Sequence, residues 1–382
     1  MTATLPEGNT ALEVFVVGGL GRNRHPRMPP RLGGGRMSRA PPGGQSPRPP
    51  VWEGEGETHN FFPHKVHPIQ IAYAHGLVLG DVTLVKDKRS QHLWRAQVST
   101  THPAMERAFV EGFLPLSIDG KIRKYPVRGG ATPYKWNIYA WISAEIAETL
   151  AVKGPRATLF YAESKDLLAA FTAGLLDSDG GISLAIVRRK RMNYRPRFEP
   201  RVAIYNADKE LLEALRRLWL KYGIKLRLGK DRSPQLKRPW KGKLVVYELA
   251  TASYPMIVRF LLTILPYMKH WEKITKAKIT IKHIVSTIPW KPQPIANLRD
   301  KICLLIRLQV REYIKQAEQA YKDKKAYIIT RNGVIEKKVK RPKRKEDPSP
   351  SLYHTHILRY TDIICYNAIP YLLPETSVLV LC

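Results

Sequence analysis

Apolar residues between positions 164 and 180 follow a helical pattern that ends on carboxylates. They recur at three- and four-residue spacing, the spacing of one helix face, at Leu167, Leu168, Phe171, Leu175 and Leu176. Ser164 stands just before this run, where a hydroxyl side chain is typical of a helix N-cap. The pattern therefore predicts a buried helix that ends at the stretch LLDSDG.

The chain after this helix predicts a series of short elements. Residues 182–265 contain two strand-like runs, a helix with Asp208 as its cap and Gly223 as its stop, two further strands and a closing helix. Residues 71–150 predict the same order of elements, although their amino-acid sequence is different. The sequence therefore predicts an α+β chain with two α-β-β-α-β-β-α halves.

The first helix of each predicted half carries small residues four positions apart. They are Gly76 and Gly80 in the first half, and Gly174 and Ser178 in the second. Small residues at this spacing lie on one helix face and allow a second helix to approach closely. We expect the two helices to pack side by side and parallel along these positions.

An aspartate follows each small-residue stripe. Parallel packing would bring Asp81 and Asp179 together at the C-terminal ends of the two helices, where the macrodipole is negative and carbonyl groups lack partners. Two carboxylates at such an end repel one another unless a cation lies between them. A hard divalent metal such as Mg²⁺ is the expected cation.

The stretch TAGLLDSDG resembles the LAGLIDADG signature of homing endonucleases, and AHGLVLGDV resembles a diverged second copy. The second copy departs from the pattern at His75, Leu79 and Val82. The resemblance covers roughly residues 65–280 and is to the single-chain, two-motif members. It implies a pseudo-two-fold DNA-binding saddle in which the two motif helices form the interface.

The resemblance also implies one shared metal site. Its ligands would be the carboxylates of Asp81 and Asp179, helped by the backbone carbonyls of Gly80 and Ser178. Asn206 ends a strand where the family often places a water-orienting amide.

A lysine near the metal site is a further implied feature. Lys269 and Lys273 are the second-half candidates, and we assign the catalytic role to Lys269. Lys153 is the candidate in the first half.

Charge supports a polyanionic partner. The 382 residues include 64 Lys and Arg against 32 Asp and Glu, which gives a net charge of +32. Residues 61–281 alone hold 38 basic against 18 acidic side chains. Basic residues also alternate with apolar ones at 224–228, which makes one strand face cationic. The expected DNA-binding residues are Lys86, Lys88, Arg89, Arg95, Arg188, Arg189, Lys190, Arg191, Arg195, Arg197, Lys225 and Arg227.

Composition divides the chain into four regions. Residues 1–60 lack Lys and are dense in Pro, Gly and Arg, which predicts a disordered tail. Residues 61–160 and 161–281 are the expected halves. Residues 282–382 form a basic extension of unassigned role, with a predicted helix over 296–324 and a hairpin at Asn332-Gly333. The pair His354 and His356 is interpreted as part of a loop.

These features together predict a metal-dependent, intron-encoded, site-specific double-strand DNA endonuclease that works as a monomer. Two alternatives use the same scaffold: an intron RNA maturase, and a DNA-binding protein that has lost cleavage. Three cysteines without a CxxC pair fit a reducing, intracellular setting. The expected location is the cytoplasm of a prokaryote, with an archaeon favoured by the low Asn and Gln content, or an organelle. No apolar run reaches 18 residues, so we expect no membrane span.

Overall fold

The structure of the chain is a computed structural model. It describes residues 66–87, 90, 92–128, 134–187, 197–230, 245–286, 292–338 and 357–358. The predicted tail over 1–60 therefore lies outside the described residues.

The first half follows the predicted order. Its elements are α1 (Pro68–Val78), β1 (Thr83–Lys86), β2 (Leu93–Thr100), α2 (Pro103–Phe113), β3 (Ile122–Arg128), β4 (Tyr134–Ser143) and α3 (Ala144–Ala151). A short helix, α4 (Pro155–Leu159), leads to the second half.

The second half repeats this order. Its elements are α5 (Lys165–Asp179), β5 (Gly180–Val187), β6 (Arg197–Asn206), α6 (Lys209–Lys221), β7 (Arg227–Lys230), β8 (Tyr247–Thr251) and α7 (Tyr254–Ile264). The predicted helix signals are confirmed: Ser164 accepts a hydrogen bond from the Leu167 amide, and Asp208 accepts one from the Leu211 amide. Gly223 ends α6 at φ 71°, a conformation that favours glycine.

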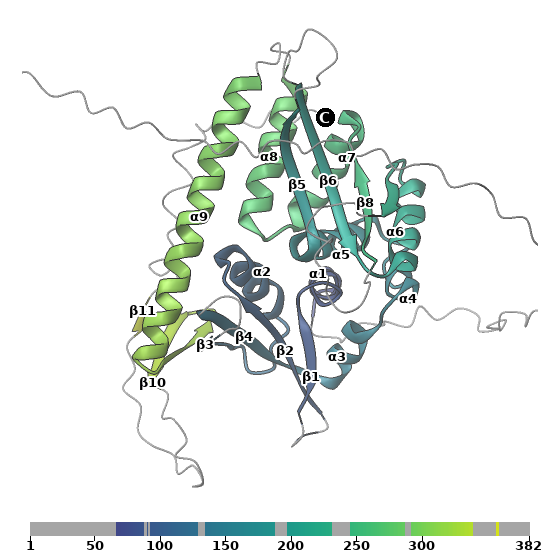
Figure 1. Cartoon of the computed structure of the whole chain (residues 1–382). Coiled ribbons are helices and arrows are strands. Elements are labelled where there is room, and N and C mark those ends of the chain that lie inside the picture. Colours follow the sequence, from purple (N-terminus) through teal and green to yellow (C-terminus); the bar gives the residue numbers. More distant parts are fainter. Residues whose placement is uncertain are drawn as a thin grey trace, which may run out of the picture. The chain divides into compact units, whose positions relative to one another are not determined.

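Strand order supports the duplication independently of the element order. The first sheet begins β1-β2-β4-β3 and the second is β5-β6-β8-β7, so corresponding strands occupy corresponding positions (Figure 1). The pairs within both sheets are antiparallel. The predicted fold of two α-β-β-α-β-β-α halves is thus confirmed.

Helices α1 and α5 pack against each other through their small residues. A Cβ atom added at Gly76 would lie 2.1 Å from the Phe171 carbonyl oxygen, and one at Gly174 would lie 2.0 Å from the Tyr73 carbonyl oxygen. Farther along, a Cβ at Gly80 would lie 2.1 Å from the Ser178 hydroxyl. The Cβ at Gly76 would also lie 2.5 Å from the Leu175 amide nitrogen, so positions 76 and 80 face positions 175 and 178. Contacts therefore advance in the same direction along both segments, which confirms the predicted parallel packing.

His75, one of the departures from the motif, is a structural residue. Its ring is fully buried, with Nδ1 2.7 Å from the Tyr161 hydroxyl and Nε2 2.7 Å from the Val152 carbonyl oxygen. Because a carbonyl only accepts, Nε2 donates and Nδ1 accepts from Tyr161. Burial lowers the pKa of His75 to about 4, so the ring is neutral at physiological pH.

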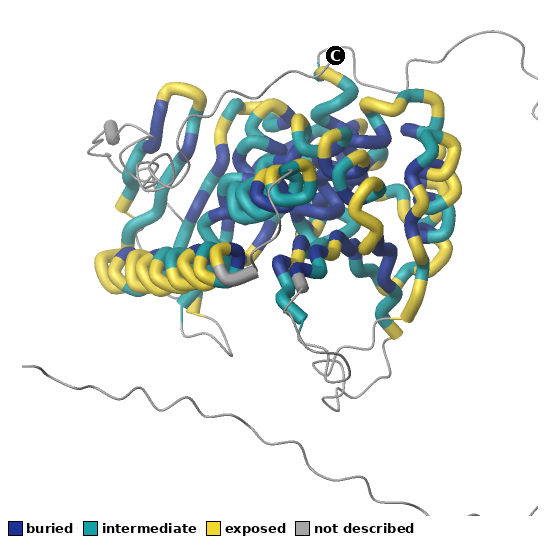
Figure 2. Tube along the Cα trace, turned by 90° about the horizontal axis from the view of Figure 1, so that it is seen from above, coloured by how far each residue is buried: buried dark blue, intermediate teal, exposed yellow. Residues whose placement is uncertain are grey.

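Both sheets pack one face against helices. In β4, Trp136, Ile138, Ala140 and Ile142 are buried while the intervening residues are partly exposed. The predicted alternation at 224–228 is present, with Ile224 and Leu226 buried and Lys225 exposed. Buried residues, dark blue in Figure 2, are concentrated in the interior of the described structure.

The C-terminal elements pack against both halves. They are α8 (Trp271–Val285), α9 (Pro292–Lys322), β9 (Lys325–Thr330), β10 (Gly333–Lys338) and β11 (Ile357–Leu358). Ile279 of α8 and Ile295 of α9 cluster with Leu184 of β5. Strand β9 instead pairs with β3 and extends the first sheet, and the predicted turn at Asn332-Gly333 joins β9 to β10. The expected boundary at residue 281 falls inside α8. None of the described helices combines the length and apolar character needed to cross a membrane.

The helix contact predicts a large cost for one added methyl group. Gly174→Ala should lower the free energy of unfolding by roughly 2–4 kcal/mol, although Ala favours a helix, because the Tyr73 backbone must move. Denaturant unfolding measures this difference. Gly229→Ala is the control, since a Cβ there meets no atom within 4 Å. Equal unfolding midpoints for wild type and Gly174→Ala would contradict the observed packing.

His75 predicts a pH-dependent stability difference. Its folded-state pKa of about 4 lies below the ordinary histidine value of 6.5, so the unfolded chain binds the extra proton first as the pH falls. The stabilisation is complete above pH 6.5 and is lost progressively toward pH 4, by up to about 3 kcal/mol. We expect the stability advantage of wild type over His75→Gln to shrink over this range in denaturant unfolding. A constant advantage from pH 7 to pH 4 would contradict the prediction.

Candidate metal and nucleic-acid site

The two predicted catalytic acids meet where α1 and α5 end. Asp179 is the last residue of α5, and Asp81 follows the turn after α1. A Cβ added at Gly80 would lie 3.0 Å from Asp179 Oδ2, so the chain before Asp81 touches the Asp179 side chain. Burial, and then the charge of Asp81, raise the pKa of Asp179 to about 6. The structure therefore brings together Asp81, Asp179, Gly80 and Ser178.

Lys273 holds the end of α5. Its Nζ donates to the carbonyl oxygens of Leu176, Asp177 and Ser178 at 2.8, 2.7 and 3.0 Å. These carbonyls belong to the last turn, where the helix dipole is negative. Burial lowers the pKa of Lys273, whereas the nearby carboxylates, including Asp81 and Asp179, oppose that shift. Of the two lysine candidates, Lys273 is the one at the paired helix ends.

Lys269 points to a different place. Its Nζ lies 5.1 Å from the centre of the Tyr73 ring, while its backbone N–H donates to Asp177 Oδ2 at 2.7 Å. The geometry therefore favours Lys273 over our predicted Lys269 as the lysine of the acid site. Sequence spacing cannot decide between the two lysines, because Lys269 lies just before α8 and Lys273 lies near its start.

Asp177, the first acid of the motif, is an anchor and is fully buried. Its Oδ2 accepts hydrogen bonds from the Tyr73 hydroxyl at 2.8 Å and from the backbone N–H groups of Lys269 and His270. These bonds tie α5 to α1 and to the start of α8. The first half has Leu79 at the corresponding position.

Asn206 also has a structural partner. Its Nδ2 donates to the Leu79 carbonyl oxygen at 3.1 Å, and its Oδ1 accepts from the Asp208 N–H at 2.9 Å. The amide predicted to orient water thus satisfies a free carbonyl at the end of α1. Its water-orienting role stays a prediction.

Cationic and aromatic side chains share the open face of the first sheet, which is the face turned away from the helices. The guanidinium carbons of Arg95 and Arg123 lie 5.5 and 5.8 Å from the centre of the Tyr139 ring. The strand register places Lys86 opposite Trp94, on the other face from Arg95. Arg95 therefore lies on the open face and Lys86 on the opposite one, and the DNA-binding role of each stays a prediction.

The second sheet presents Arg227 and Arg201 on its open face, and Lys225 is exposed just before β7. Arg201 pairs with Glu248 at 2.5 Å. The side chain of Arg197 and the predicted residues Lys88, Arg89, Arg188, Arg189, Lys190, Arg191 and Arg195 lie outside the described part of the chain.

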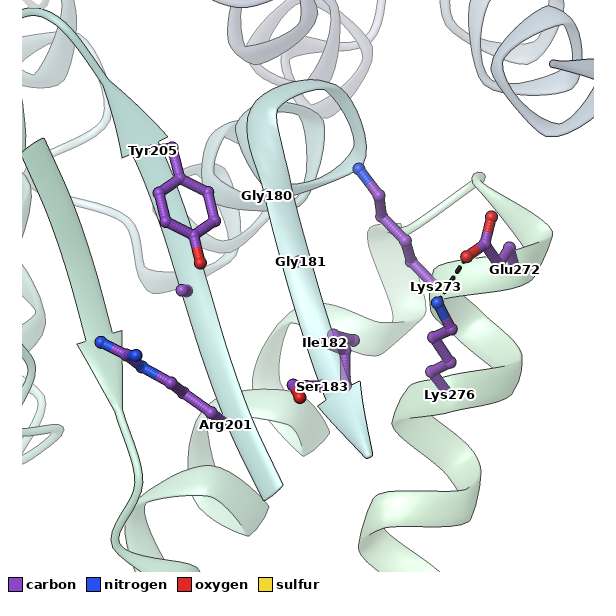
Figure 3. Close-up of a pocket in the computed structure, with 10 residues that line it drawn as sticks. Gly180, Gly181, Ile182, Ser183, Arg201, Tyr205, Glu272, Lys273 and Lys276 are labelled. Carbon is purple, nitrogen blue, oxygen red and sulfur yellow. Dashed lines mark hydrogen bonds and ion pairs between the residues drawn. The ribbon is translucent and has the colours of Figure 1, made fainter. Parts of the chain in front are cut away.

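A cavity of about 190 Å³ opens beside the acid site, between the open face of β5 and β6 and the start of α8. Gly180 and Gly181 line it directly after Asp179, and Lys273, Lys276 and Arg201 flank it (Figure 3). In Figure 3 the Lys273 side chain points toward Gly180, whereas Lys276 is paired with Glu272. Its position and its cations suit a phosphate group.

The sequence comparison identifies a domain in the second half. The family model for the LAGLIDADG-like domain matches residues 166–260. This match confirms the resemblance carried by TAGLLDSDG and spans the chain from α5 into α7. No curated protein sequence matches the chain.

Solved structures similar to this chain include three protein–DNA complexes. I-DmoI in complex with DNA and Ca is 18% identical, with 52% of this chain and 90% of that chain covered at a TM-score of 0.34. The homing endonuclease I-WcaI bound to its DNA recognition sequence is 15% identical (55% and 87% covered, TM-score 0.37). The meganuclease I-SmaMI bound to uncleavable DNA is 10% identical (62% and 95% covered, TM-score 0.36).

Proposed function

We propose that this protein is a DNA endonuclease of the LAGLIDADG homing type, which hydrolyses both strands of a specific double-stranded site. The observation that carries the proposal is the meeting of Asp81 and Asp179 at the ends of two parallel, tightly packed helices. The LAGLIDADG-like domain, which includes Asp179, supports it.

The acid site fits a hard divalent cation. It offers carboxylate and carbonyl oxygens, the ligands that Mg²⁺ prefers. Burial, and then the charge of Asp81, raise the pKa of Asp179, and a bound dication would offset both effects. Asp81, Asp179 and the Gly80 carbonyl would hold the ion. When bound, such an ion lowers the pKa of a water ligand and stabilises the leaving oxygen.

Lys273 has a positioning role in this proposal. Its ammonium group offsets the negative end of α5 and holds the carbonyls of residues 176–178 in place. Asp179 follows directly in the chain as the last residue of α5. The Ser178 carbonyl oxygen already accepts a hydrogen bond from Lys273. It is therefore a weaker candidate for a metal ligand than we expected from the sequence.

DNA would lie along the open faces of the two sheets. Arg95, Arg123 and Tyr139 on the first sheet and Lys225 and Arg227 near β7 combine charge with hydrogen-bond donors, as groove and phosphate recognition requires. The cavity flanked by Lys273 and Lys276 would take a backbone phosphate next to Asp179. Binding would then place a phosphodiester within reach of the acids.

The catalytic assignment predicts that each aspartate is needed for cleavage and neither for binding. Asn has nearly the same shape as Asp but lacks the charge that holds a hard dication. We expect Asp179→Asn and Asp81→Asn to fold and to bind DNA, with cleavage reduced by roughly a thousandfold or more, as the loss of a metal-activated nucleophile implies. Linearisation of a plasmid carrying the uninterrupted host gene in Mg²⁺ measures cleavage, and a gel shift in Ca²⁺ measures binding.

Asp300→Asn is the matched control, because it removes the same charge from an exposed position in α9. Full linearisation by Asp179→Asn would refute the catalytic role. If wild type binds this DNA but does not cut it, the protein is a DNA-binding protein without cleavage. Preferential binding of intron RNA would support the maturase alternative.

The lysine assignment predicts a difference between two matched variants. Lys273→Met keeps the alkyl chain but removes the ammonium from three carbonyls, so we expect cleavage to fall at least about tenfold, equivalent to about 1.4 kcal/mol in the barrier. Lys269→Met leaves its backbone bond to Asp177 intact and should change cleavage less. Single-turnover cleavage with both variants saturated by DNA gives the comparison. A larger loss for Lys269→Met would reverse the assignment.

A further inference from the structure

Two helices from different parts of the chain begin at one cluster of side chains. His102 is the N-cap of α2, His270 is the N-cap of α8, and Glu272 lies in the first turn of α8. One nitrogen or carboxylate oxygen from each lies within 4.8 Å of the other two. His102 Nε2 and Glu272 Oε2 are 3.0 Å apart, and the centres of the His102 and His270 rings are 5.2 Å apart.

His270 is the unusual member of this cluster. It is 5% exposed, and its Nδ1 is enclosed with no hydrogen-bond partner in the described part of the chain. A buried nitrogen without a partner is costly, because it has lost water and gained nothing in return. Coordination of an ion would supply the missing interaction.

We propose that His102, His270 and Glu272 bind a transition-metal dication of the Zn²⁺ class. Two imidazoles and one carboxylate form a set of nitrogen and oxygen ligands typical of zinc, and a water molecule would complete four-coordination. The side chains of His102 and Glu272 are 26% and 15% exposed, so the ion has a route from solvent. None of the three ligands is an acid at the ends of α1 and α5, although Glu272 also lines the cavity beside Asp179. The zinc proposal does not depend on the proposed endonuclease activity.

The surroundings of the cluster select the type of ion. Lys276 Nζ lies 2.5 Å from Glu272 Oε1, and two helix N-termini contribute positive potential. Such a field disfavours a weakly held, hydrated ion such as Mg²⁺. Only an ion with a strong preference for imidazole overcomes it, as Zn²⁺, Ni²⁺ and Co²⁺ do.

Metal binding would exchange one contact for another at His102. In the structure, His102 Nδ1 accepts a hydrogen bond from the Ala104 N–H at 3.2 Å. The ring proton is therefore on Nε2, which faces Glu272 Oε2. Ligation through Nε2 moves the ring proton to Nδ1 and gives up the capping bond. The ion in return joins α2 of the first half to α8, which follows the second half.

The test is metal retention by the full chain in which His354 and His356 are changed to Ala, so that this sequence pair does not compete. The protein is loaded with Zn²⁺ in the presence of millimolar Mg²⁺, dialysed and analysed for metal. We expect about one Zn²⁺ per chain, a higher melting temperature with Zn²⁺ than without, and Co²⁺ absorption bands typical of low coordination number. Asp179→Asn in this background should behave identically.

His102→Asn is the informative variant, because Asn is a good helix N-cap but a poor zinc ligand. We expect its Zn²⁺ affinity to fall at least tenfold, and Glu272→Gln to show a similar loss. His67→Asn is the matched control: His67 caps α1 in the same way, outside the cluster, and its replacement should leave retention unchanged. No retained Zn²⁺, or equal retention by His102→Asn, Glu272→Gln and the parent, would overturn the proposal. Circular dichroism checks that each variant is folded.

Discussion

The contact between α1 and α5 is the constraint on which the rest of the structure depends. Their backbones approach so closely that the Cβ atoms missing at Gly76 and Gly174 would overlap carbonyl oxygens of the opposite helix. Parallel packing at this distance leaves one relative placement of the two helices. It joins the two halves and brings the two C-terminal ends together. Asp81 and Asp179 are therefore neighbours as a consequence of how glycine packs, before any ion or DNA is considered.

The same arrangement concentrates negative charge at the C-terminal ends of α1 and α5. A different side chain binds the free carbonyl groups at each of these two ends. Lys273 donates to three carbonyls at the end of α5, whereas the uncharged Asn206 donates to the Leu79 carbonyl at the end of α1. The group that donates to the end of α5 is thus charged, and the one that donates to the end of α1 is neutral. Because the Asp179 side has this ammonium and the Asp81 side an amide, we expect the two halves of the acid site to differ in their hold on a metal and in their speed of strand cleavage.

Much of the fold was readable from the sequence, because it rests on local signals. Helical spacing, N-caps at Ser164 and Asp208 and small residues four apart are properties of short segments, and each is present as predicted. The choice between Lys269 and Lys273 was not readable, since it depends on how the 3₁₀ turn at Leu265–Tyr267 and the start of α8 set the direction of each side chain. The cluster of His102, His270 and Glu272 was missed for a related reason. His102 is more than 160 positions from His270 and Glu272 along the chain and meets them only through tertiary packing.

The two halves share one topology but are anchored by different polar groups. In the second half, buried Asp177 binds the backbone at the start of α8, and that role has no counterpart at Leu79. The first half gains its anchor from the C-terminal extension instead. Buried Glu106 accepts from Lys124 Nζ and from the Tyr313 hydroxyl of α9. Removing one partner of such a buried pair costs about 3–5 kcal/mol, so α9 and β9 are part of the folded first half and not an appendage to it. A first motif without its first acid is thus compatible with a stable first half, because the polar anchor comes from residues more than 200 positions farther along the chain.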